Sequence, residues 1–213
     1  MAKIKAGILS KVSGKVAGVV GGTWKGTNYL RELVKPANPN TPLQQAQRSQ
    51  MRAVVRCART LTGDVFKPYL DKFLKNMSGY NWFVKNNIKK FSGLNNALAS
   101  ALAFSSGNLP TIDCTLTKTA GSEALGFGES NFAAPAGHSA KVVGIVYNDN
   151  TGLSKVGVAD YDAQGGYCLT EEDLGEFWTA SDRISYGTFL VDIDANGVVQ
   201  AIGTSTSYFE TIA

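Results

Sequence analysis

The chain offers few residues whose types and spacing suit catalysis. His138 is the only histidine, so every catalytic triad and most metal sites must use it or do without one. It lies in the segment Ala-Pro-Ala-Gly-His-Ser, which is typical of a loop. The acidic run Glu171–Asp173 could do acid–base chemistry, but after Thr170 it better fits the first turn of a helix. We therefore expect no enzyme, and a hydrolase acting through acidic loops is the least favoured reading.

Two segments begin like calcium-binding loops. Asp192, Asp194 and Asn196 fit the pattern D-x-D-x-N-G, in which carboxylates bind a hard cation and glycine permits a tight turn. Residues 160–165 fit this pattern more loosely. The first loop lacks the bidentate acid at its twelfth position, which is Gly203. We predict hairpin turns at both places, so the three residues are weak calcium candidates and no cofactor is expected.

The best candidate binding residues are four arginines at helical spacing. Arg48, Arg52, Arg56 and Arg59 fall within about 80° of arc on a predicted helix, opposite its apolar face. They form a line of about 17 Å at the helical rise of 1.5 Å per residue. Arginine binds phosphate or carboxylate through two parallel hydrogen bonds. Every basic residue on this helix is arginine, which favours a definite acidic partner over a merely solvated helix face.

Charge is divided unevenly along the chain. Residues 1–110 contain 17 Lys and Arg and three acids, a net charge of +14, whereas residues 111–213 contain four Lys and Arg and 14 acids, a net charge of −10. The basic half could meet nucleic acid phosphates, the acidic half of the same chain, or the acidic half of another copy. The last contact is heterologous and builds rings or filaments. Simple solvation of both charged surfaces is the remaining alternative.

The three cysteines lie too far apart for a shared metal site. Cys57, Cys114 and Cys168 match neither a CxxC motif nor a zinc spacing. An odd number argues against a closed set of disulfides and favours a reducing compartment. We expect all three to be small buried apolar side chains.

No apolar run approaches the roughly 20 residues that span a bilayer, so no membrane contact is expected. The N-terminus superficially resembles a signal peptide, with Lys3 and Lys5 ahead of small residues. Lys11 and Lys15, however, interrupt the apolar stretch. We therefore predict that the protein is not secreted by a signal peptide.

Glycines punctuate residues 7–31 and separate valines from aromatic residues. Because glycine costs about 1 kcal/mol at each helix interior site, we predict short strands or an extended arm here. Such a segment has too few long side chains to bury itself, so it should pack on another domain or subunit. We expect its contact residues to be Trp24, Lys25, Tyr29 and Arg31.

Residues 36–106 read as a small helical domain. Thr41 and Pro42 form a helix start, a hydroxyl cap followed by proline at the first helical position, and Gly63 should end that helix. Residues 105–110 read as a linker. The predicted helices cover about residues 42–62, 67–77, 80–91 and 94–102.

Beyond this linker the apolar pattern changes to period two, which is typical of strands. Asn196-Gly197 is the strongest hairpin signal. About seven short strands predict an immunoglobulin-like antiparallel β-sandwich at residues 107–213, with acidic character. The fold class is therefore α+β, with a glycine-rich β arm at residues 1–35 ahead of the helical domain. The predicted strands cover residues 112–117, 124–128, 141–148, 154–159, 167–170, 183–193 and 198–204.

Several N-terminal motifs occur together. They are KIKAGIL at residues 3–9, SGKV at 13–16, VVG at 19–21, WKG at 24–26, YLR at 29–31 and NPNTP at 38–42. Together they resemble a family of uncharacterised proteins encoded by bacteria and their phages, and the resemblance covers about residues 1–60. It implies a link to a phage or prophage, and from that a role in a virion or its assembly. It implies no catalytic residue.

These observations predict a multicopy structural protein. We expect a homo-oligomer held by the arm and by opposite charges, located in a virion or in the cytoplasm of the producing bacterium. Other virion proteins are further candidate partners. The alternative is a nucleic-acid-binding protein that uses the basic helical half.

Overall fold

A computed structural model describes residues 2–4, 13–24, 26–35, 37, 40–92, 97–118, 123–175 and 177–212. The chain divides into two compact units, residues 1–41 and 42–213, which we describe separately. This division differs from the three predicted domains, because helices and strands of the second unit share one hydrophobic core.

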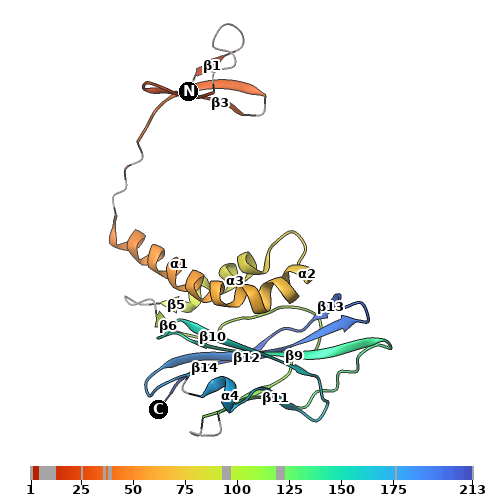
Figure 1. Ribbon diagram of the computed structural model, residues 1–213. Coiled ribbons are helices and arrows are strands. Elements are labelled where there is room, and N and C mark those ends of the chain that lie inside the picture. Colours follow the sequence, from red (N-terminus) through yellow and green to blue (C-terminus); the bar gives the residue numbers. More distant parts are fainter. Residues whose placement is uncertain are drawn as a thin grey trace. The chain divides into compact units, whose positions relative to one another are not determined.

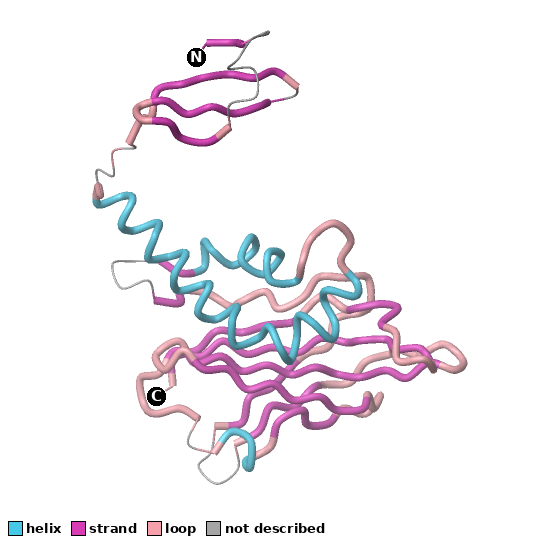
Figure 2. The backbone as a smooth tube through the Cα atoms, turned by 45° about the horizontal axis from the view of Figure 1, so that its top comes forward, coloured by secondary structure: helices cyan, strands magenta, loops and turns pink. Residues whose placement is uncertain are grey.

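The first unit is a four-stranded antiparallel sheet with the strand order β1-β4-β3-β2. The expected short strands are thus present in this glycine-rich segment, and they pair with one another (Figure 2). Gly26 turns the chain between the two central strands with a φ of +76°, a conformation that suits glycine. The strands are β1 (Ala2–Ile4), β2 (Gly14–Val16), β3 (Val19–Trp24) and β4 (Thr27–Glu32).

The second unit contains two larger antiparallel sheets. In the central sheet, β9 (His138–Asn148) lies between β10 (Leu153–Asp160) and β12 (Arg183–Asp194). Two strands then share the far edge of β12, namely β14 (Thr206–Thr211) and β13 (Val199–Ile202). The other sheet has the order β11 (Gly166–Leu169), β8 (Ala124–Phe127) and β7 (Cys114–Thr117), and α4 (Glu171–Leu174) follows β11.

The helices precede these sheets in the chain. They are α1 (Pro42–Leu61), η1 (Thr62–Leu70), α2 (Asp71–Phe73), α3 (Gly79–Asn87) and η2 (Ile88–Lys90). The expected end of the first helix at Gly63 is wrong, because the chain continues directly into the π-helix η1. Gly63 does not adopt the left-handed φ that would cap a helix. The start of α3 is capped by Ser78, whose hydroxyl accepts a hydrogen bond from the Asn81 N–H.

The second unit has three layers, with the helices on one face of the central sheet and the smaller sheet on the other (Figure 1). Alternate residues of β9 define the two interfaces. Ile145 and Tyr147 belong to the core that includes the helices, whereas Val146 packs in the core that includes β7, β8 and β11. Gly144 allows the sheets to approach closely, because a Cβ there would lie 2.5 Å from the Cβ of Cys168.

The predicted fourth helix and linker are both wrong over the described residues. β5 (Phe91–Ser92) pairs with β6 (Ala97–Leu98), and the chain then forms neither a helix nor a named strand before β7. Backbone groups of this segment find partners far away: Leu102 N–H donates to the Ser185 hydroxyl at 2.9 Å. The supposed linker is also buried at Ser105, whose hydroxyl donates to the Gly203 carbonyl at 2.7 Å.

All seven predicted strands of the C-terminal half are present, and β14 is an additional strand. The mixed α+β class is confirmed, and two antiparallel sheets that pack face to face agree with a β-sandwich. Among the described residues, no helix is long and apolar enough to span a membrane.

Candidate interaction surfaces

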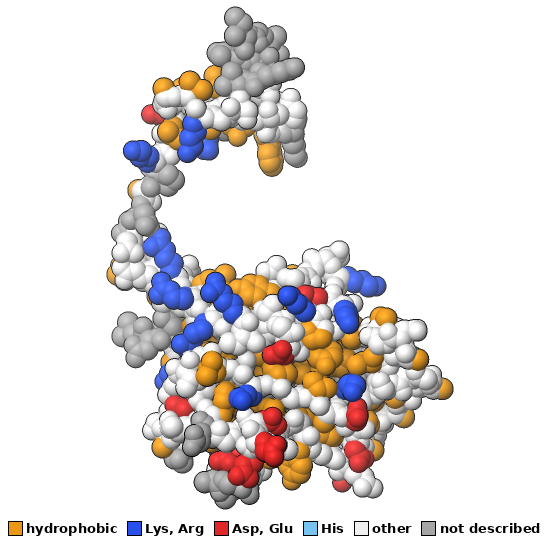
Figure 3. All heavy atoms as spheres, viewed as in Figure 1, with side chains coloured by type: hydrophobic (Ala, Val, Ile, Leu, Met, Phe, Trp, Pro, Cys, Tyr) orange, Lys and Arg blue, Asp and Glu red, His pale blue; other side chains and the backbone are white. Residues whose placement is uncertain are grey.

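The second unit carries opposite charges on opposite sides. Lys and Arg side chains gather over the helices, and Asp and Glu side chains gather towards α4 (Figure 3). The predicted arginine line lies on α1, where all four residues, Arg48, Arg52, Arg56 and Arg59, are exposed. On the acidic side, residues 171–173 are exposed and form the first turn of α4. The expected helix turn after Thr170 is therefore confirmed, and its carboxylates stabilise the start of α4.

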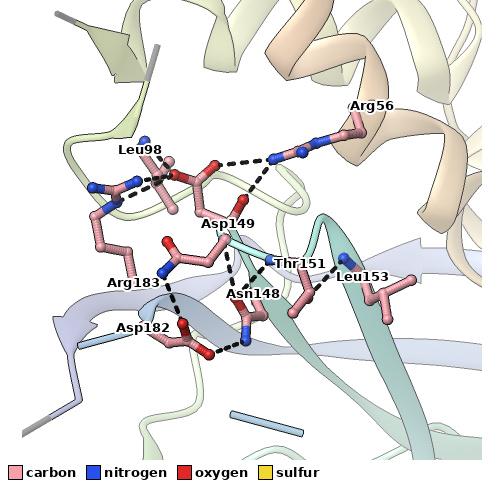
Figure 4. Close-up of polar contacts among 9 residues, drawn as sticks. Arg56, Leu98, Asn148, Asp149, Thr151, Leu153, Asp182 and Arg183 are labelled. Atoms are coloured by element: carbon pink, nitrogen blue, oxygen red, sulfur yellow. Dashed lines mark hydrogen bonds and ion pairs between the residues drawn. The ribbon is translucent and has the colours of Figure 1, made fainter. Parts of the chain in front are cut away.

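Arg56 departs from the other three arginines. Its Nη2 donates to the backbone carbonyl oxygen of Asp149 at 2.5 Å and lies 3.7 Å from Oδ1 of the same residue (Figure 4). The Asp149 carboxylate is buried, and its Oδ2 also accepts from Arg183 Nη2 at 3.2 Å and from the Leu98 N–H at 2.9 Å. Arg56 is thus engaged by the acidic half of its own chain, although 49% of its side chain remains exposed.

A second polar cluster holds the neighbouring turn. The Asn148 side-chain amide donates to Asp182 Oδ2 at 2.8 Å and to the Phe177 carbonyl at 3.0 Å. Asn150 donates to the other carboxylate oxygen of Asp182 at 2.7 Å. The backbone N–H of Thr179 lowers the pKa of Asp182 most, and these two amides lower it further. The cluster fixes the β9–β10 turn against the chain that leads into β12.

The calcium candidates form a hairpin turn, as the sequence predicts. Asp194 Oδ1 accepts from the backbone N–H groups of Asn196 and Val198, both at 2.9 Å, and its Oδ2 accepts from Gln200 at 2.8 Å. The Val198 N–H is the main cause that lowers the pKa of Asp194. Gly197 has a φ of +77°, which this turn requires.

Asp192, the third candidate, points elsewhere. Its Oδ2 lies 2.9 Å from Nδ1 of His138, so the only histidine of the chain is paired with a buried carboxylate. Over the part of the chain that the structure describes, no group of three or more His, Cys, Asp or Glu side chains could hold a metal ion. In the looser calcium segment, Asp162 Oδ1 likewise accepts from the Gln164 N–H of a turn, at 3.0 Å.

Strand register gives the N-terminal sheet two different faces, because residues directly opposite in an antiparallel pair point to the same side. Trp24 lies opposite Thr27, and Gly22 lies opposite Tyr29. We call this side the aromatic face, and we call the other side the apolar face. The aromatic face comprises Lys15, Val20, Gly22, Trp24, Thr27, Tyr29 and Arg31. The apolar face comprises Gly14, Val16, Val19, Gly21, Thr23, Asn28, Leu30 and Glu32.

Three of the four predicted arm contacts are therefore on one side of this sheet. Trp24, Tyr29 and Arg31 share the aromatic face, and Lys25 lies outside the described residues. The sequence reasoning did not separate out the apolar face. The face consists of every second residue of these glycine-containing strands. This period-two pattern can be recognised only once the strand pairing is known.

The described side chains of the N-terminal sheet are mostly exposed or half-buried. Among residues 13–41 whose side chains are described, only Gly21 is buried. Val16 is 64% exposed, Val19 is 41% exposed and Trp24 is 70% exposed. A sheet of this size needs an apolar face packed against something to be stable. Both faces of this sheet are consequently candidate interaction surfaces.

Comparison with known proteins adds a family but no activity. The sequence model of DUF6266, a family of unknown function, matches residues 11–196. No curated protein matches the chain, and no solved structure matches it. The family match runs through both units, from the N-terminal sheet to the hairpin at Asn196.

Proposed function

Because the chain belongs to DUF6266, a family of unknown function, we propose its role from its own residues. It is a non-enzymatic structural protein that assembles in many copies, as a component of a phage virion or phage-like particle. The link to phage rests on the resemblance of the N-terminal motifs. The self-assembly rests on the N-terminal sheet.

The observation that supports self-assembly most is the exposure of Val16 and Val19 on the apolar face of that sheet. Val16 and Val19 lie side by side on it as a cross-strand pair, and Leu30 follows on β4. Burial of apolar surface contributes about 25 cal/mol per Å². Two such faces from two copies can pack as a small sandwich about 10 Å thick. We propose that this pairing buries the exposed valines of the described strands.

Opposite charges supply a second, different contact. Arg52 and Arg59 are exposed on the helical side of the second unit, and Glu171 and Glu172 are exposed near its opposite side. Docking the first side onto the second in another copy gives a heterologous contact, which propagates. Together with pairing through the N-terminal sheets, this contact extends an assembly beyond a dimer.

Light scattering and electron microscopy of the purified full chain test the proposal. Wild type should form large particles in dilute buffer and smaller ones at 1 M salt, because salt screens contacts between exposed charges. Val16→Asp on the apolar face should reduce particle size, whereas the matched variant Thr27→Asp on the aromatic face should not. A monomer at every protein concentration and salt concentration would contradict self-assembly.

A second candidate function is nucleic acid binding by the helical half. Arg48, Arg52 and Arg59 remain exposed on one helix, while Arg56 is bound to Asp149. A phosphate partner predicts that affinity for duplex DNA falls steeply with salt, with a slope of about −0.9 for each phosphate contact. The triple variant with glutamine at Arg48, Arg52 and Arg59 should lose that binding. Unchanged binding by the triple variant would exclude this surface.

A further inference from the structure

We propose that the aromatic face of the N-terminal sheet binds single-stranded nucleic acid. This inference concerns a different surface from the apolar face, and it does not depend on self-assembly. It also uses a different part of the chain from the arginines of α1. Three features of the face lead to it: a tyrosine platform, an exposed tryptophan next to it, and positive charge without a carboxylate.

The tyrosine platform is formed by a cross-strand pair. Gly22 on β3 lies directly opposite Tyr29 on β4. A Cβ on Gly22 would lie 2.9 Å from the Tyr29 hydroxyl oxygen and 3.0 Å from its Cζ, so the phenol end of Tyr29 lies over the glycine backbone. Gly22 leaves room for the ring because it has no side chain, and the Tyr29 ring covers the Gly22 backbone. The ring is thereby held against the sheet, with its outward side half exposed.

Trp24 extends the platform by one step. It lies opposite Thr27, and is therefore a diagonal neighbour of Tyr29, at about 7–8 Å for such pairs. Both strands are central in the order β1-β4-β3-β2. Aromatic side chains on the central strands of a four-stranded sheet are the arrangement on which unpaired bases stack. The 70% exposure of Trp24 leaves its ring accessible to a base.

The charges beside these rings suit a phosphate backbone. Lys15 on β2 and Arg31 on β4 both lie directly opposite Val20, so they flank β3 on the aromatic face. Residues 1–41 contain seven Lys and Arg and a single acid, Glu32. Glu32 lies opposite Val19 and belongs to the apolar face. The described part of the aromatic face therefore carries cations and no carboxylate, which favours a polyanion.

The rings decide which polyanion fits. An acidic surface of another copy would satisfy Lys15 and Arg31. It would make no use of the exposed ring surface of Trp24 and Tyr29. Paired bases in a duplex are not accessible for stacking, whereas unpaired bases are. A single strand therefore uses both the cations and the rings.

Fluorescence anisotropy with a fluorescein-labelled oligo(dT) of 12 nucleotides tests this site in the full chain. Trp24→Ala should weaken binding about 5- to 100-fold, the usual effect of losing one stacked base. Tyr29→Ala should do the same, whereas Tyr29→Phe keeps the ring and should bind nearly as wild type. Val16→Ala on the opposite face is the matched control and should leave affinity unchanged. Arg31→Gln should reduce the slope of log affinity against log salt by about 1.

The alternatives give different results in the same assay. Polyglutamate that displaces oligo(dT) at equal charge concentration, together with no effect of Trp24→Ala, would mean an acidic protein partner and overturn the inference. A 12-base-pair duplex whose affinity falls as much as that of oligo(dT) in Trp24→Ala would also overturn it, as would the absence of oligo(dT) binding at low salt. Trp24→Ala tests an exposed residue, so the result stands even if Tyr29→Ala disturbs the sheet. Parallel light scattering shows whether self-assembly has changed, which separates this inference from the proposed function.

Discussion

Arg56 on α1 and Asp149 at the end of β9 are joined by a hydrogen bond of 2.5 Å and an ion pair, although 93 residues separate them in the chain. The contact ties the helical layer to the central sheet. It also joins the two oppositely charged halves of the sequence, because Arg56 of the basic half pairs with the buried Asp149 of the acidic half. Asp149 binds Arg183 as well, so the carboxylate is held between two guanidinium groups.

Removal of the Asp149 carboxylate should destabilise the second unit. Asp149→Ala leaves the buried Leu98 N–H without its acceptor, which costs about 1–3 kcal/mol, and separates β6 from the sheet. Urea unfolding followed by circular dichroism measures the change. Asp160→Ala is the matched control: it breaks a surface ion pair with Lys141 and should alter stability by less than about 0.5 kcal/mol. Equal effects of the two variants would contradict the role of Asp149.

Gly107 should not tolerate a side chain. A Cβ there would lie 1.8 Å from the backbone oxygen of Ile202, so Gly107→Ala must push the segment around it away from β13. We expect a loss of about 1–3 kcal/mol in the free energy of unfolding. Gly63→Ala is the matched control within η1, where a Cβ meets nothing within 4 Å. Because alanine favours helix, that variant should gain up to about 1 kcal/mol, and a stable Gly107→Ala protein would refute the close contact.

The Asp182 cluster predicts a loss of stability in acid. In the folded chain, the pKa of Asp182 lies below the ordinary value of 3.8, chiefly because the Thr179 N–H donates a hydrogen bond to its carboxylate. Its contribution to stability is therefore complete above the unfolded pKa and is lost as the pH falls through the lower folded pKa. Asp182→Asn should flatten the dependence of stability on pH below about 4, as measured by urea unfolding at several pH values. Superimposable pH profiles for variant and wild type would count against this cluster.

The cysteines should be inert in the folded protein. Burial raises the pKa of Cys57 well above its ordinary value, that of Cys114 to about 11 and that of Cys168 to about 12. All three are buried free thiols, which confirms the prediction from their spacing. At pH 8 a thiol reagent such as DTNB should label no cysteine before unfolding and three cysteines in denaturant. Rapid labelling of the native chain would show that a thiol is accessible.

Local apolar patterns were sufficient to predict most elements. The period-two pattern indicated β9 and β12, although most residues of both strands are buried, and α1 reads as an amphipathic helix after the Thr41-Pro42 start. β14 was missed, because its segment is polar and acquires its strand form by pairing with β12. The arginine line on α1 could likewise be located from its spacing, but the internal partner of Arg56 could not.

The sequence by itself determined the α+β class, seven strands of the C-terminal half, the turn at Asn196-Gly197 and the burial of the three cysteines. Each of these depends on residues that are neighbours along the chain. Only the tertiary structure decided that residues 97–105 form no helix and which side chains share a face of the N-terminal sheet. The reason is distance along the chain: the Phe104 N–H, for example, is satisfied by Ser205, 101 residues away. A local apolar pattern cannot predict a hydrogen-bond partner so far along the chain. Where local preferences are weak, these distant hydrogen bonds determine the backbone conformation.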